Sequence, residues 1–272
     1  MTFKQKLDAT IKKNNSLVCV GLDSDIAKLP SHLTGKKNPQ FEFNKAIVDA
    51  THTDVLAYKP NSAFYEVTGA QGITELKMTC DYIRSMYPDV VIIIDAKRAD
   101  IGNTNEGYAR FVFDYLGADA VTLHPYLGRE ALKPFLDRKE KGSIILCRTS
   151  NPGAGEFQDL EVKGKPLYQV VAEKIAKDWN YNGNCALVVG ATYPTELAIV
   201  RRLVGDMPIL IPGIGAQGGD VEKTLRAGLD SDKAGAIINS SRSIIFASSG
   251  TDFAKRAREE TIKLKDEINT FR

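Results

Sequence analysis

Short apolar runs recur at regular intervals along the chain, and longer segments with helical periodicity separate them. The short runs are rich in valine and isoleucine, which is typical of strands that are buried on both faces. An alternation of such strands with helices predicts a parallel sheet, because each helix returns the chain to the same end of the sheet. The predicted strands cover residues 17–22, 55–58, 90–94, 118–123, 143–147, 186–189, 209–211 and 236–238.

A parallel sheet with this many strands can be a closed barrel or an open, doubly wound sheet. No dinucleotide-binding fingerprint follows the first strand, which favours the barrel. The length of 272 residues is also close to that of one such barrel. We therefore expect an α/β fold, a single (β/α)8 TIM barrel in which residues 1–272 form one domain. The predicted helices cover residues 41–51, 71–86, 103–116, 129–136, 168–179, 195–203, 221–227 and 252–271.

The charge balance argues against several classes of partner. The chain has 36 basic and 34 acidic residues, and this small, evenly spread excess predicts binding neither to nucleic acid nor to a membrane. No apolar run approaches the roughly 20 residues that cross a bilayer, and residues 1–15 lack the apolar stretch of a secretory signal. The 4 cysteines are scattered without the spacing of zinc ligands. We expect a cytoplasmic protein with reduced thiols and no metal.

Two connections are longer than the two to six residues usual for loops in such folds. They cover residues 24–40 and 150–166, and both follow predicted strands. Both therefore belong to the carboxyl face of the barrel, where barrel enzymes hold their active sites. Either connection can be an insertion without a role. The Ser-Asn-Pro-Gly sequence at 150–153 resembles a hinge, however, and favours a lid over residues 150–166.

The most informative stretch is residues 91–100, VIIIDAKRAD, in which charged residues follow an apolar strand. Side chains alternate between the two faces of a strand, so Asp95 and Lys97 point the same way and Arg98 points the other way. We expect Asp95 and Lys97 to face the barrel interior near its carboxyl end. Burying such charges costs several kcal/mol per ion unless each ion is paired.

Charged residues also end the two preceding strands. Asp23 follows the first strand, Lys59 ends the second, and Asp100 lies where the chain leaves the third. Alternating positive and negative groups keep each other ionised when they lie close together. A stabilising network without chemistry, or a pair facing a polar groove outside the barrel, is the alternative. The density and position of these charges favour an active site.

A glycine-rich segment follows the seventh predicted strand. Gly213, Gly215 and Gly218 match the G-x-G-x-x-G pattern of dinucleotide sites, but that pattern normally follows the first strand. About 20 residues further on, where such sites carry an acidic residue, the chain has Asn239 instead. We interpret the segment as a phosphate loop with exposed backbone N–H groups, and Arg242 as its charged partner. The alternative is a simple turn beside a surface arginine.

Several of these blocks together resemble the orotidine 5′-phosphate decarboxylase family, in its longer bacterial form with arginine inside D-x-K-R-x-D. The resemblance extends over essentially the whole chain, and its specificity comes from several blocks in the right order. One departure is Ser24, where the family pattern has proline, and this position has no proposed chemical role. The blocks are GLD at 21–23, KPNSAFYE at 59–66, DAKRADIGNT at 95–104, TSNPG at 149–153, residues 212–219, and Ser241 with Arg242.

The resemblance implies decarboxylation of orotidine 5′-monophosphate to uridine 5′-monophosphate in pyrimidine biosynthesis, without a metal or an organic cofactor. It implies that Lys97 protonates C6 of the pyrimidine and that Asp95 lies beside the substrate carboxylate. Lys59 and Asp100 would complete the charged array.

The resemblance also implies a homodimer with shared active sites. Asp100, Ile101 and Thr104 would reach into the site of the neighbouring subunit. The implied substrate contacts are Asp23, Lys59 and Thr104 at the ribose hydroxyls, Ser150 at the pyrimidine edge, and Gln217 and Arg242, with Ser241 beside them, at the phosphate.

Two other classes of function stay open at this point. Related barrels that share D-x-K-x-x-D act on sugar phosphates as decarboxylases or aldolases, and they need Mg²⁺. A non-catalytic barrel of this kind would bind uridylate and leave orotidylate intact.

Overall fold

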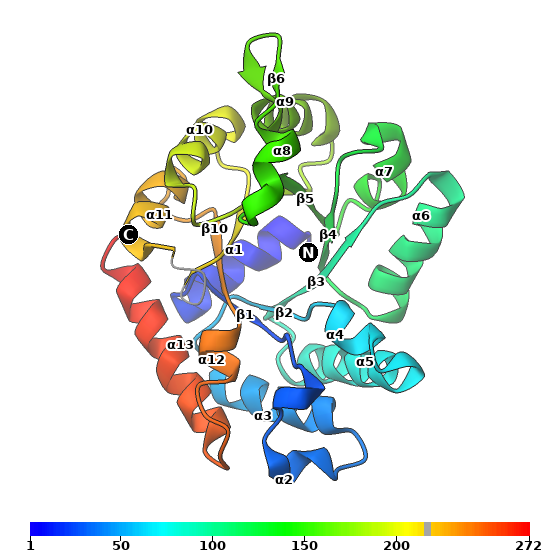
Figure 1. Cartoon of the computed structure of the whole chain (residues 1–272), viewed down its shortest axis with the longest axis vertical. Helices are drawn as coiled ribbons and strands as arrows, with labels where there is room; N and C mark the ends of the chain where they lie inside the picture. Colours follow the sequence, from blue (N-terminus) through cyan, green and yellow to red (C-terminus); the bar gives the residue numbers. More distant parts are fainter. Residues whose placement is uncertain (215–218) are drawn as a thin grey trace.

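The structure, a computed structural model, describes residues 1–214 and 219–272 and contains a closed barrel of parallel strands surrounded by helices (Figure 1). The first strand pairs with both the second and the last, so the sheet closes into a ring. The predicted (β/α)8 TIM barrel is confirmed. The barrel strands are β1 (Val18–Gly21), β2 (Ala57–Lys59), β3 (Val91–Arg98), β4 (Ala120–Leu123), β5 (Gly142–Arg148), β8 (Cys185–Val189), β9 (Ile209–Pro212) and β10 (Ala236–Ser240).

The barrel strands are buried on both faces, as their composition predicted. Every residue of β1, β2, β4, β8 and β10 is buried. All the predicted strands are present, but β3 continues past the predicted end at residue 94 to Arg98, and β10 continues past residue 238 to Ser240. These extensions carry polar side chains, so a search for apolar runs stops short of them.

The predicted helices are also present around the barrel (Figure 1). Two of them change character before they end, because the π-helical segments η2 (Arg110–Tyr115) and η4 (Ile175–Trp179) continue α6 and α9. The helices are α3 (Pro39–Thr51), α5 (Gly69–Met86), α6 (Gly102–Ala109), α7 (Gly128–Leu136), α9 (Leu167–Lys174), α10 (Pro194–Val204), α11 (Val221–Gly228) and α13 (Phe253–Asn269).

Helix α1 (Phe3–Asn14) is not among the predicted elements. Its start is a capping box, in which the Thr2 hydroxyl accepts from the Gln5 backbone N–H and the Gln5 side chain accepts from the Thr2 N–H. Its buried face is Phe3, Leu7 and Ile11, at intervals of one helical turn. Lysines and other polar residues between these positions obscure the spacing in the sequence.

Helix α1 covers the amino ends of the barrel strands (Figure 1). Lys6 Nζ lies 2.7 Å from Asp119 Oδ2, just before β4, and Asn14 Nδ2 donates to the Val55 carbonyl, just before β2. The Thr10 hydroxyl donates to a carbonyl before β3. With one end covered in this way, the carboxyl ends of the strands are the end at which a site can open.

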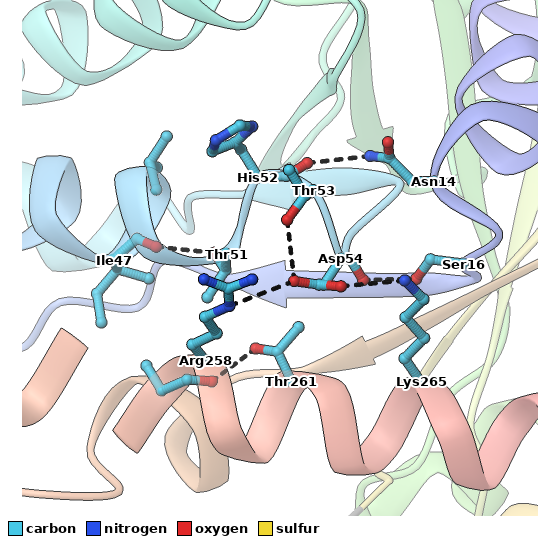
Figure 2. Close-up of polar contacts among 12 residues, drawn as sticks. Asn14, Ser16, Ile47, Thr51, His52, Thr53, Asp54, Arg258, Thr261 and Lys265 are labelled. Atoms are coloured by element: carbon cyan, nitrogen blue, oxygen red, sulfur yellow. Dashed lines mark hydrogen bonds and ion pairs between the residues drawn. The ribbon is translucent and has the colours of Figure 1, made fainter. Parts of the chain in front are cut away.

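Asp54, just before β2, ties the C-terminal helix α13 to the barrel (Figure 2). Its carboxylate lies 3.0 Å from Lys265 Nζ and 3.7 Å from Arg258 Nε, and it accepts from the Thr53 hydroxyl. Its backbone carbonyl accepts from the Ser16 hydroxyl just before β1. The Asp54 side chain is only 12% exposed, so these ion pairs are partly desolvated and stronger than surface pairs.

The two long connections contain short elements that the sequence did not predict. Residues 24–40 include η1 (Ile26–Lys28) and α2 (Ser31–Thr34). Residues 150–166 include η3 (Pro152–Ala154), α8 (Gly155–Gln158) and an antiparallel hairpin of β6 (Glu161–Val162) and β7 (Lys165–Pro166). Two further short helices are α4 (Ala63–Glu66), after β2, and α12 (Arg242–Ile245), after β10. Within the described ranges, none of the helices has the length and apolar character needed to cross a membrane.

We expect Asp54→Asn to lower the free energy of unfolding by about 1–2 kcal/mol, because it leaves two cations of α13 without their partly buried counterion. Urea unfolding at neutral pH and fixed protein concentration measures this loss as a lower midpoint with an unchanged slope. Asp89→Asn is the matched control, since Asp89 and its partner Lys13 are both more than 60% exposed. It should cost less than about 0.5 kcal/mol. Equal losses in the two variants would contradict the assigned role of Asp54.

Candidate active site

A cavity of about 680 Å³ opens at the carboxyl ends of the barrel strands. Residues from the ends of strands on all sides of the barrel line it, so the closed sheet brings together side chains that are far apart in the sequence. Among the predicted site residues, Asp23, Lys59, Asp95, Lys97, Ser150, Ser241 and Arg242 line this cavity.

One carboxylate is shared by two lysines at the bottom of this cavity. Asp95 Oδ2 lies 2.8 Å from Lys59 Nζ, and Asp95 Oδ1 lies 2.6 Å from Lys97 Nζ. The Thr122 hydroxyl donates to the same Oδ1 atom at 2.9 Å. The Lys59 side chain is 4% exposed, whereas that of Lys97 is 49% exposed. Lys59 is therefore a buried counterion, and Lys97 presents its ammonium group to the cavity.

Within this Lys59–Asp95–Lys97 array, Asp95 and Lys59 keep each other charged. Burial by itself would raise the pKa of Asp95, but Lys59 and Lys97 outweigh it and hold that pKa well below its usual range. Burial would likewise lower the pKa of Lys59, but Asp95 and Asp23 raise it above its ordinary value. Asp95 is therefore ionised and Lys59 protonated at neutral pH.

The end of β3 places Lys97 by an irregular backbone. Regular pairing between β3 and β4 stops at Ile94 and resumes at Arg98. Within this bulge Lys97 has a φ of 47°, a conformation that costs a non-glycine residue of order 1 kcal/mol or more. The Thr122 hydroxyl accepts from the Lys97 N–H at 3.0 Å and so supports this conformation. Asp95 and Lys97 do face the same cavity, as predicted, but through a bulge and not a regular pleat.

Arg98 points away from the array, as the strand alternation predicted. Its guanidinium forms an ion pair with Glu66 and lies over the Tyr108 ring. The charged stretch is thus divided into two groups, and only one of them lies in the cavity.

The opposite side of the cavity is formed where the first and last strands meet. A Cβ atom on Gly21 would lie 1.8 Å from the Ser241 Oγ atom, so only glycine permits this close approach. Ser241 and Arg242 follow β10 at the start of the short helix α12. Among the described residues, the buried atoms Asp23 Oδ1 and Asn239 Oδ1 have no hydrogen-bond partner. Both residues line the cavity, so it contains acceptors that a bound ligand can satisfy.

Three predicted site residues do not line this cavity, and a fourth lies outside the described residues. Asp100, Ile101 and Thr104 lie beyond the end of β3 and do not line it, and the Ile101 side chain is exposed. The Asp100 carboxylate accepts from the Ile101 N–H. The Asn105 side chain accepts from the Asp100 N–H and donates to the Asp100 carbonyl. Gln217 lies outside the described residues.

Other polar residues line the cavity although the sequence did not single them out as site residues. Thr122 lies in an otherwise apolar strand, and Asn239 directly follows the apolar residues 236–238 of β10, so that contrast was a usable signal. Asn61, Thr149 and Asn151 lie in sequence blocks that carried the family resemblance, although no role was assigned to them. Lys28 and Gln158 lie inside ordinary loop sequences, where nothing separates them from surface residues. The missed residues are Lys28, Asn61, Thr122, Thr149, Asn151, Gln158 and Asn239.

Comparison with known proteins agrees with this arrangement. The model of the orotidine 5′-phosphate decarboxylase / HUMPS family matches residues 16–257. The chain is 50% identical to orotidine 5′-phosphate decarboxylase of Janthinobacterium sp. (strain Marseille), over 100% of this chain and 99% of that protein, and 51% identical to that of Ralstonia pickettii (strain 12J), over 100% of both. The solved structure of OMP decarboxylase from Leishmania donovani has a TM-score of 0.83 and 36% identity, and it covers 98% of this chain and 99% of that one.

The family expected from the sequence motifs is thereby confirmed. The matches extend over the barrel and over every block that carried the resemblance. The chain therefore belongs to the orotidine 5′-phosphate decarboxylase / HUMPS family.

Proposed function

We propose that this chain decarboxylates orotidine 5′-monophosphate to uridine 5′-monophosphate in pyrimidine biosynthesis, without a metal or an organic cofactor. The observation that carries the proposal is the Lys59–Asp95–Lys97 array at the bottom of a cavity. The proteins that share about half of the residues of this chain over its full length are named for the same reaction.

Lys97 supplies the proton in this proposal. When the bond between C6 and the carboxylate breaks, the electron pair stays on C6, and no adjacent group in the ring can delocalise it. A fixed ammonium group stabilises this charge and then transfers a proton from Nζ to C6, while CO2 leaves. Lys97 suits this role because its side chain is half exposed to the cavity, and Asp95 holds its Nζ atom at 2.6 Å.

Asp95 has two roles in the proposal. It orients the Lys97 ammonium, and its ionised carboxylate lies beside the carboxylate that leaves the substrate. Repulsion between these two negative groups is relieved when CO2 departs, which favours the reaction. Lys59 keeps Asp95 ionised, since it is buried next to it at 2.8 Å.

Other residues of the cavity bind the ribose, the pyrimidine edge and the phosphate of the substrate in this proposal. Asp23 and Lys59 bind ribose hydroxyls. The Oδ1 atom of Asp23 suits this role because it has no hydrogen-bond partner within the described residues. Ser150 contacts the pyrimidine edge. Arg242 binds the phosphate, since its exposed guanidinium lies at the rim of the cavity beside Ser241. Gln217 is part of the phosphate site in this proposal.

A homodimer completes the site in this proposal. Asp100 and Thr104 follow the catalytic strand directly but do not line the cavity of their own chain. Ile101 and Tyr126 are exposed nearby, after β3 and β4, and apolar side chains at these positions suit burial against a second copy. Asp100, Ile101 and Thr104 then enter the partner's cavity, where Asp100 adds the second carboxylate of the array.

We also propose that residues 1–272 form one domain that works in the cytoplasm. Helices α1 and α13 both pack on the barrel and do not form units of their own. The 4 cysteines are buried free thiols, which suits a reducing compartment.

Sugar-phosphate chemistry is the nearest competing function, because the family model covers more than one activity. The decisive test is ultraviolet detection of orotidylate consumption by purified protein treated with EDTA. We expect full turnover, unchanged when Mg²⁺ is added back. Turnover of a sugar phosphate that depends on Mg²⁺, with orotidylate left intact, would overturn the proposed function. Binding of uridylate without turnover of orotidylate would instead indicate a non-catalytic barrel.

We expect Lys97→Ala to lower kcat by about 10⁴-fold or more, because it removes both the proton donor and the stabilising charge. Circular dichroism and the unfolding midpoint should show that the variant still folds. Lys12→Ala is the control, since Lys12 lies exposed on α1 far from the cavity, and it should keep the wild-type rate. Substantial residual turnover by Lys97→Ala would refute the role of Lys97.

Mixing the inactive variants Lys97→Ala and Asp100→Ala should restore activity if sites are shared between subunits. Each hybrid dimer would contain one intact site, built from Lys97 of one chain and Asp100 of the other. Random exchange of equal amounts should give about a quarter of the wild-type rate. Mass spectrometry of differently tagged chains verifies the exchange. No recovery in verified hybrids would argue against shared sites.

A further inference from the structure

Arg148 is a buried cation that the proposed mechanism does not use. It is the last residue of β5 and does not line the cavity. Its side chain is only 4% exposed. Its guanidinium lies 4.0 Å from the centre of the Tyr193 ring. A buried guanidinium costs several kcal/mol unless it is paired, so its counterion matters.

The counterion of Arg148 comes from the connection that follows β5. Arg148 Nη2 lies 3.1 Å from Asp159 Oδ2, and Asp159 itself is 48% exposed. Arg148 Nη1 also donates to the Thr149 carbonyl at 3.1 Å and lies 3.4 Å from Gln158 Oε1. Residues 158 and 159 are the end of α8 and the position after it, so this one side chain holds α8 against the end of β5 (Figure 1).

Gln158 makes the second half of the attachment. Its Oε1 atom accepts from the Thr149 N–H at 2.9 Å, and its Nε2 atom donates to the Thr149 hydroxyl at 2.9 Å. Gln158 and Thr149 both line the cavity, as do Ser150 and Asn151. We call the contacts among Arg148, Thr149, Gln158 and Asp159 the β5 latch.

The β5 latch lies directly before Ser150, the proposed contact to the pyrimidine edge. On its other side Ser150 packs against Gly190, where an added Cβ atom would lie 2.6 Å from the Ser150 Cβ atom. The position of Ser150 is thus set by the end of β8 on one side and by the latch on the other. A shift of the latch moves Ser150 relative to the base, and a small displacement of a group that contacts the substrate costs enzymes large factors in catalytic efficiency.

We propose that Arg148 is a positioning residue, which acts through Asp159 and Gln158 to hold residues 150–158 in the conformation that binds the pyrimidine. This inference rests on the proposed function for the identity of the bound base. Without the latch, substrate binding must itself order the segment, which weakens binding. Loss of the latch therefore raises KM, whereas a general loss of folded protein lowers the apparent kcat and leaves KM unchanged.

The first test measures kcat and KM for Arg148→Met, Asp159→Asn and the double variant. We expect each single variant to lose about 10- to 100-fold in kcat/KM, mainly through KM, and the double variant to lose no more than Arg148→Met. Arg148→Lys should recover part of the loss, because it restores the charge. Glu173→Gln is the matched control, since it removes the other ion pair of this connection, between Glu173 and Lys165, and should keep the wild-type KM.

The second test reads the conformation of the segment directly, by trypsin cleavage after Lys163. This residue is exposed in the turn between β6 and β7, and the next lysine precedes Pro166 and so resists trypsin. In the wild type, uridine 5′-monophosphate should suppress cleavage. In Arg148→Met and Asp159→Asn, cleavage should be faster without ligand, and protection should need more uridylate.

Wild-type KM and wild-type cleavage in both variants would overturn the role of Arg148. Fully additive losses in the double variant would also do so, because the two residues would then act separately. If Arg148→Met fails to fold, Asp159→Asn decides the question alone, since its half-exposed carboxylate can change without disturbing the core. Failure of the proposed function is distinguishable: the wild type would not consume orotidylate, while the ligand-free cleavage rates would still report on the latch.

Discussion

The shared carboxylate of Asp95 is the interaction on which the rest of the site depends. A buried Lys59 is tolerated in the barrel interior only because Asp95 lies 2.8 Å from it, and the second oxygen of Asp95 is then free to hold Lys97. The Asp95 carboxylate is thus the shared counterion of a buried lysine and of a lysine that faces the cavity. Removing Asp95 would leave two like charges close together, so the three groups form a single electrostatic unit.

The fold could be predicted from the sequence to a large extent, because its strands are buried on both faces. Such strands appear as short apolar runs, and most barrel strands contain one without interruption. Helix α1 was not predicted because its buried face has about one apolar residue per turn, with lysines and other polar residues between them. The sequence also predicted that Asp95 and Lys97 share one side of β3, but the structure reaches this arrangement through a bulge, which leaves no mark in the sequence.

The rest of the site could not be predicted, because it depends on contacts between distant segments. Gln158 and Arg148 are ordinary polar residues in the sequence, and only the path of α8 brings them together at the mouth of the cavity. The same holds for Asn239, whose unsatisfied oxygen becomes meaningful once β10 lies next to β1. Asp100 differs from these residues, because the sequence motif does identify it. Its proposed position, however, is in the cavity of another copy of the chain.

The pairing of β1 with β10 has a consequence for how the protein is made. The cavity combines Asp23, near the start of the chain, with Arg242, near its end, and the seam between them closes only when the last strand joins the first. During synthesis a ribosome must release nearly the whole chain before any ligand can bind. A nascent chain can therefore gain no stability from its substrate, and the early strands must rely on their own packing until the ring is complete.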